Sequence, residues 1–102
     1  MRTMESIRVC INEKEAEGFV IPIGKVSLVF MKTEKGMIGC GAFDVGALEK
    51  FGYPAAKVKP AGNSVKDIND LLSGEIAAAN SSAEKLGIKK GMSGKEAAAF
   101  IV

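Results

Sequence analysis

The sequence predicts an α+β fold: an N-terminal antiparallel or mixed β-sheet region followed by short alternating strands and helices, in a single two-layer domain. Three observations lead to this prediction. The chain has 102 residues, which is enough for one hydrophobic core and too few for two. Residues 1–41 are mainly runs of β-branched and aromatic residues. Residues 42–102 alternate short apolar runs with helix-capping and turn signals. The expected domain therefore spans residues 1–102.

Strands account for most of the first region. The segment Glu5–Ile11 alternates apolar and polar residues, which is typical of a half-buried strand. Two further strands are expected at Ala16–Ile23 and Lys25–Lys32, with a bend or bulge at Gly24 between them. In the last of these strands both faces are mostly apolar, with Val26, Leu28 and Phe30 on one face and Ser27, Val29 and Met31 on the other. One face should cover the core, so we expect the other to be buried against a second subunit.

Strands and helices alternate in the second region. A turn at Glu34–Gly36 precedes a short strand at Met37–Gly41. The following elements are expected in order: a helix capped by Asp44 and ending near Phe51, a strand at Ala55–Pro60, a helix opened by the capping-box-like run Ser64–Asp67, a strand at Glu75–Ala79, a helix from Ser81 to Gly87, and a last helix from Ser93.

The composition excludes several kinds of chemistry. The chain has no histidine, so it cannot build a Ser-His-Asp or Cys-His nucleophile pair by itself, nor a His-based metal site. Two cysteines cannot complete a tetrahedral thiolate zinc site in one subunit, and we expect no metal and no cofactor. Fourteen basic and twelve acidic residues leave a net charge of +2, which gives no general attraction to nucleic acid or to an anionic membrane.

Location follows from the absence of targeting signals. The N-terminus lacks the apolar stretch of a signal peptide. The most apolar segment, Phe19–Met31, is interrupted by Pro22, Gly24 and Lys25 and is too short to cross a membrane. A cytoplasmic protein is therefore expected, with Cys10 and Cys40 as reduced thiols.

The candidate catalytic residues are Cys40 and Asp44, in the run Gly39–Asp44 between a strand and a helix. Backbone N–H groups at such a junction favour an anion and can activate a thiol, so Gly39 and Gly41 are candidate ligand-binding residues. The alternative is structural: a tight turn, a packed Cys40 and Asp44 as a helix cap. The run also resembles a dinucleotide-binding fingerprint, but Asp44 stands where a glycine is needed and would repel a pyrophosphate.

Two further segments invite functional interpretations. Asn80 and Ser81 follow a strand and could bind a polar ligand, although both residue types are also expected as helix caps. The C-terminal stretch Ala83–Ser93 has the outline of a helix-turn-helix, but its connection is too long. The last helix contains one lysine, one glutamate and an apolar end, so packing explains it better than DNA binding.

The chain resembles the YunC-like family of small bacterial and archaeal proteins, a domain of unknown function. The resemblance rests on Gly36–Val45, on the helix Val65–Leu72 and on Ala83–Ala97, and it extends over nearly the whole chain. It implies a compact α+β fold whose N-terminal β region mediates tetramerisation. It implies no activity for any residue.

Three functional hypotheses follow. The first is an uncharacterised homo-oligomeric cytosolic protein with a structural or small-ligand-binding role, its partner being another copy of itself. The second is a small-molecule enzyme that uses Cys40 in its glycine-rich turn. The third, a nucleic-acid-binding or regulatory protein, is disfavoured by the charge and by the apolar last helix.

Overall fold

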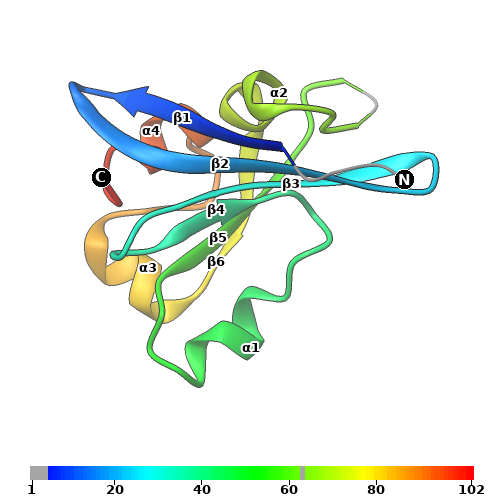
Figure 1. Cartoon of the computed structure of the whole chain (residues 1–102). Coiled ribbons are helices and arrows are strands. Elements are labelled where there is room, and N and C mark those ends of the chain that lie inside the picture. Colours follow the sequence, from blue (N-terminus) through cyan, green and yellow to red (C-terminus); the bar gives the residue numbers. More distant parts are fainter. Residues whose placement is uncertain (1–4, 63) are drawn as a thin grey trace.

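Six strands and four short helices make up the chain in a computed structural model that describes residues 5–62 and 64–102 (Figure 1). In order they are β1 (Glu5–Ile11), β2 (Lys14–Ile23), β3 (Val26–Lys32), β4 (Met37–Gly39), α1 (Val45–Glu49), β5 (Ala55–Lys59), α2 (Ile68–Ser73), β6 (Glu75–Ala79), α3 (Ser81–Leu86) and α4 (Gly94–Ala98). The predicted α+β class is confirmed. The predicted domain also includes residues 1–4 and 63, which lie outside the described residues.

All six strands belong to one mixed sheet in the order of the sequence, β1 to β6. Neighbouring strands are antiparallel except β4 and β5, which are parallel. A parallel pair cannot be joined by a tight hairpin, and the connection from β4 to β5 therefore crosses over through α1. The β2–β3 connection is a two-residue turn, Gly24–Lys25, and the long hairpin that it closes extends beyond the rest of the sheet (Figure 1).

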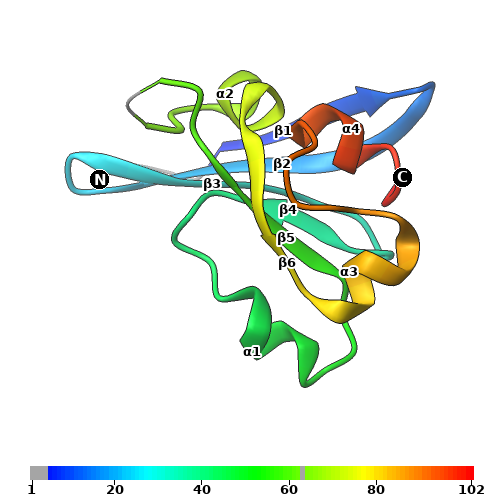
Figure 2. The ribbon, with the colours of Figure 1, turned by 180° about the vertical axis from the view of Figure 1, so that it is seen from behind.

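Helices α2 and α4 cover one face of the sheet, which we call the inner face (Figure 2). Alternate residues of the strands point into the core beneath these helices. The largest fully buried side chains are Met31, Ile38, Leu71, Ile76, Ile88, Ile101, Val29 and Val58. Helix α4 approaches α2 closely, since a Cβ on Gly94 would lie 2.2 Å from the carbonyl oxygen of Leu71. Only a glycine allows this contact.

Helix α1 lies on the opposite face, which we call the outer face, and covers only part of it (Figure 1). A second, smaller apolar cluster forms there around Met37, Val45 and Ala55, with Phe30, Phe43, Leu48, Tyr53 and Ala78 packed against it. The two predicted layers are therefore found over β1–β3, while α1 adds a third layer at β4 and β5. Much of the outer face of the β2–β3 hairpin carries no helix.

Helix starts follow capping residues, and one differs from the sequence prediction. Asp67, and not Ser64, is the N-cap of α2, and its side chain accepts a hydrogen bond from the backbone N–H of Asp70 (2.9 Å). The predicted start is therefore wrong by about one turn. Val65 still packs against the main core, but from the loop before the helix. The last helix begins after Ser93 as predicted, and it has a capping box in which Ser93 and Glu96 each accept the other's backbone N–H.

Candidate functional site

The end of β4 and the loop after it hold four of the six candidate residues. Cys40 is buried, with 7% of its surface exposed. Its backbone N–H donates to the carbonyl of Val29 (2.9 Å), and its carbonyl accepts from the N–H of Phe43 (3.3 Å). A reactive thiol must be reachable by its substrate. The structure therefore places Cys40 in a packed position and not in the wall of an open cleft.

Asp44 lies close in sequence to Cys40 and has a local structural role. It is the N-cap of α1, and its Oδ1 accepts a hydrogen bond from the backbone N–H of Ala47 (3.0 Å). The carboxylate is exposed while the thiol of Cys40 is buried. The two groups thus lie in different environments, and a shared catalytic role for them stays a prediction.

The two candidate glycines differ in what surrounds them. A Cβ on Gly39 would lie 2.5 Å from Cδ2 of Phe43, so the absence of a side chain makes room for that aromatic ring. The ring of Phe43 in turn contacts Phe30 edge-on, with centroids 5.2 Å apart. A Cβ on Gly41 would meet nothing closer than the carbonyl oxygen of Val58 at 3.9 Å. Packing therefore explains Gly39 and does not explain Gly41.

Asn80 is another candidate ligand-binding residue, and every hydrogen-bonding position of its side chain is occupied within the fold. It is buried, with 6% exposure. Its Oδ1 accepts from the backbone N–H of Ala55 (3.1 Å) and of Ala83 (2.9 Å). Its Nδ2 donates to the carbonyls of Val45 (3.0 Å) and Tyr53 (2.9 Å). An amide group has two donors and two acceptor positions, so all four are occupied and none is left for a ligand.

Ser81 is exposed, and the residue after it makes the contact that sequence reasoning missed. The carboxylate of Glu49 in α1 accepts from the backbone N–H of Ser82 (2.8 Å) and from its hydroxyl (3.0 Å). The backbone hydrogen bond from Ser82, followed by the one from its hydroxyl, lowers the pKa of Glu49. This carboxylate fastens α1 to the start of α3. No local sequence pattern indicates this contact, because Glu49 and Ser82 lie 33 positions apart.

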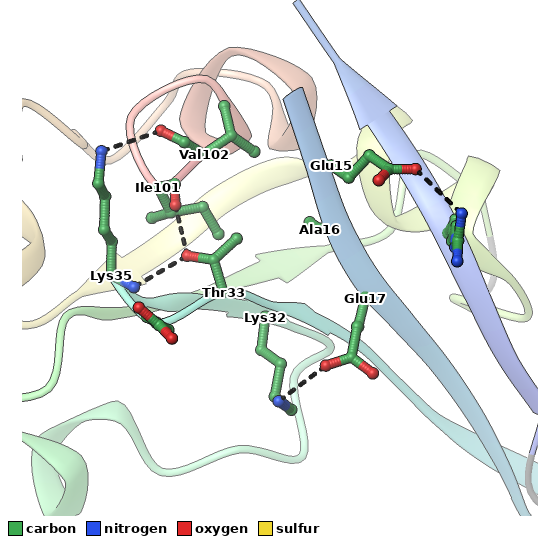
Figure 3. A pocket seen from close by; sticks show the side chains of 10 residues that line it. Glu15, Ala16, Glu17, Lys32, Thr33, Lys35, Ile101 and Val102 are labelled. Carbon is green, nitrogen blue, oxygen red and sulfur yellow. Dashed lines mark hydrogen bonds and ion pairs between the residues drawn. The ribbon is translucent and has the colours of Figure 1, made fainter. Parts of the chain in front are cut away.

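An open cavity of about 460 Å³ lies where β2, β3 and the end of the chain meet (Figure 3). Most of the charged groups on its wall have a protein partner. Arg8 contacts Glu15 (3.8 Å), Lys32 contacts Glu17 (3.3 Å), and Lys35 donates to the carbonyl of Val102 (3.3 Å). Thr33 donates its hydroxyl hydrogen to the carbonyl of Ile101. None of the candidate catalytic residues lines this cavity.

Within residues 5–62 and 64–102, no group of three His, Cys, Asp or Glu side chains could hold a metal ion. Within the same residues, no helix has the length and apolarity needed to cross a membrane.

The most conspicuous surface is a set of six apolar side chains on the outer face of the β2–β3 hairpin. We call it the hairpin patch, and it consists of Phe19, Ile21, Ile23, Val26, Leu28 and Phe30. Cross-strand pairing places these residues in three consecutive rows, Phe19 with Phe30, Ile21 with Leu28 and Ile23 with Val26. The two phenylalanine rings stack with centroids 5.0 Å apart. Ile23 is 47% exposed and Val26 61% exposed. The patch is thus an ordered apolar surface in contact with water.

These features define a class of protein, a small α+β domain with an uncovered apolar patch on one face of its sheet. The buried Cys40 and Asn80 of this domain have structural roles. Residues 39–99 match the family model described as Domain of unknown function (DUF1805), and the chain belongs to this family. It is 34% identical over 77 residues to the uncharacterized protein YunC of Bacillus subtilis (strain 168), a match that covers 76% of each chain. The resemblance identified from the sequence is confirmed.

A solved structure shares the whole architecture. The crystal structure of a protein of unknown function, TA1206 from Thermoplasma acidophilum, superposes with a TM-score of 0.87 at 27% sequence identity. The match covers 98% of this chain and 94% of the other. The relatives thus carry no assigned reaction, and this chain is an uncharacterised member of its family.

Two of the three segments that carry the family resemblance, Gly36–Val45 and Ala83–Ala97, have folding roles here. In the first run, Gly39 admits the ring of Phe43, Cys40 is buried, Asp44 caps α1 and Val45 is buried. In the second run, Gly87 ends α3 with a φ of 112°, Ile88 is buried, and Ser93 and Glu96 form the capping box. These residues, which carry the family resemblance, therefore have structural roles in the fold.

Proposed function

We propose that this chain is a self-associating structural protein of the cytoplasm and that the hairpin patch is the surface through which copies bind. The observation that carries the proposal is the exposure of Ile23 (47%) and Val26 (61%) at the end of an otherwise regular apolar ladder. A contiguous apolar surface of this kind on a small protein indicates a binding partner. A second copy brings an identical surface, which makes it a suitable partner.

The burial gained on association matches its cost only when the whole patch takes part. Complete burial of a Val, Leu, Ile or Phe side chain contributes roughly 1.5–3 kcal/mol. Four of the six side chains are already partly covered, so roughly 1 kcal/mol for each of the twelve side chains of two copies is the relevant scale. Association costs about 4–15 kcal/mol in lost freedom of motion. The two quantities are comparable, so a single charge within the patch should dissociate the copies.

The tetramer implied by the family resemblance belongs to the same proposal. One face related by a two-fold axis closes a dimer, and a tetramer therefore needs a second contact elsewhere on the surface. The cytoplasmic location is supported by the two cysteines, which are both free, one exposed at Cys10 and one buried at Cys40. Free thiols persist in a reducing compartment.

A matched pair of variants tests the interface. Ile23 lies in the hairpin patch and Ile7 lies on the inner side of β1, and the two are similarly exposed at 47% and 41%. Light scattering after size-exclusion chromatography should give Ile23→Glu a monomeric mass and leave Ile7→Glu with the mass of the unmodified chain. Equal masses for the two variants would overturn the assignment of the interface to the hairpin patch.

A further inference from the structure

We infer that two copies pack outer face on outer face with their β2–β3 hairpins running in opposite directions, about a two-fold axis along the Ile21–Leu28 row. This inference rests on the proposed self-association and specifies its geometry. It places the Phe19–Phe30 row of each copy on the Ile23–Val26 row of the other. Ile21 then faces its own counterpart, and so does Leu28.

A two-fold axis between two packed sheets can take any direction in the plane between them, but only two directions keep the strands of the two copies aligned. The axis then runs along the strands or across them. An axis along the strands keeps the hairpins parallel, so that each row of the patch meets the same row of the other copy. An axis across the strands reverses the hairpins, so that the first row meets the third. Only the middle row, Ile21 with Leu28, contacts the same row of the other copy in both arrangements.

The sizes of the side chains favour the reversed arrangement. One end of the patch carries two phenylalanines, Phe19 and Phe30, and the other end carries the smaller Ile23 and Val26. Parallel hairpins would put four phenylalanine rings together at one end and four small side chains at the other. Packed sheets keep a spacing of about 10 Å, and well-packed interfaces set large residues against small ones. Reversed hairpins give this match at both ends.

The charges next to the patch favour the same arrangement. The turn at one end carries Lys25, and the row beyond the phenylalanines contains Glu17, which forms an exposed ion pair with Lys32 (3.3 Å). Parallel hairpins would bring the two Lys25 residues together, and like charges repel. With reversed hairpins the two Lys25 residues lie at opposite ends of the interface, each near the Glu17–Lys32 row of the other copy, because Lys25 is three residues from Leu28 and Glu17 is four from Ile21. The two lysines are thereby kept apart, and the ion pair of that row has no net charge to repel them.

Cysteine cross-linking separates the two arrangements at exposed positions. Three variants are made in a Cys10→Ser background: Glu17→Cys, Lys25→Cys and the double variant. Positions 17 and 25 of one chain lie about 24 Å apart along the hairpin, because Lys25 is seven residues from the partner of Glu17 in β3, and this is beyond the reach of a short bis-maleimide within one chain. Reversed hairpins predict that the double variant is cross-linked to twice its mass on a denaturing gel while each single variant stays at the mass of one chain.

The remaining outcomes overturn the inference in distinguishable ways. Cross-linking of the Lys25→Cys variant alone would show that the two turns meet, as in parallel hairpins. No cross-linking of any variant, in a sample whose mass by light scattering is a multiple of one chain, would show that the copies bind through another surface or register. A monomeric mass for the unmodified chain would instead remove the proposed self-association itself.

Discussion

The carboxylate of Glu49 accepts two hydrogen bonds from Ser82, one from its backbone N–H at 2.8 Å and one from its hydroxyl at 3.0 Å. These bonds connect α1, on the outer face, with the start of α3. They favour the ionised carboxylate, which is why the pKa of Glu49 is lowered from its ordinary value of 4.5. The attachment of α1 to α3 should therefore depend on pH.

A group whose pKa is depressed by folding contributes stability above its unfolded pKa and loses that contribution as the pH falls through the folded pKa. We expect Glu49→Gln to lower the urea midpoint at pH 7, and the difference from the unmodified chain to shrink as the pH falls below about 4.5. Denaturation of both proteins at one fixed concentration checks this, since association also contributes to stability. A difference that stays constant down to pH 3 would contradict the role given to the ionised carboxylate.

The Asn80 side chain bonds to four backbone groups in three segments, so its replacement should be costly. Asn80→Asp keeps the shape but turns a donor into an acceptor, and a carboxylate oxygen then faces the carbonyls of Val45 and Tyr53. Unsatisfied buried polar groups cost about 1–3 kcal/mol each, so we expect a loss of roughly 2–5 kcal/mol in the free energy of unfolding. The exposed neighbour provides the control, because Ser81→Ala should change stability by less than about 0.5 kcal/mol. Equal effects of the two changes would refute the internal role of Asn80.

Gly39 and Gly41 offer a second matched comparison. An alanine at position 39 would force Phe43 from its place over the strand, because the new Cβ would lie 2.5 Å from the ring. Overpacking of this kind costs about 1–3 kcal/mol. Gly41→Ala meets open space and should leave the thermal midpoint nearly unchanged. If the change at Gly41 were the more destabilising one, the packing explanation of this loop would be wrong.

The two thiols should react very differently. Cys10 is exposed on the edge strand β1 and Cys40 is 7% exposed, so iodoacetamide should label Cys10 in the native protein and Cys40 only after denaturant is added. Peptide mapping by mass spectrometry distinguishes the two sites. Rapid native labelling of Cys40 at neutral pH would contradict its packed position and restore the enzyme hypothesis built on it.

The strands were predictable because their pattern is local. Glu5–Ile11 and Glu75–Ala79 have the predicted bounds, since alternating apolar residues and flanking turn signals fix a strand without reference to the rest of the chain. The start of α2 was not predicted, because Ser64 and Asp67 are both good caps and tertiary packing decides between them. The sequence of this segment alone does not show which of the two residues caps the helix.

The candidate site was harder to predict for the same physical reason. The sequence identifies Asn80 as a helix cap or a polar ligand, but its partners Ala55 and Val45 lie 25 and 35 residues away. The sequence also shows that β3 is apolar on both faces. It does not show that α1 covers the end of the outer face near β4 and leaves Ile23 and Val26 exposed. Partners distant in sequence decide each of these outcomes.

Self-association through the hairpin patch is the central claim, and the mass of the unmodified chain in solution tests it most directly. One chain has a mass of 10.7 kDa. Light scattering over a range of micromolar concentrations should give a whole-number multiple of that mass, falling toward one chain only on dilution. A mass of 10.7 kDa at every concentration, with the hairpin patch intact, would contradict the account.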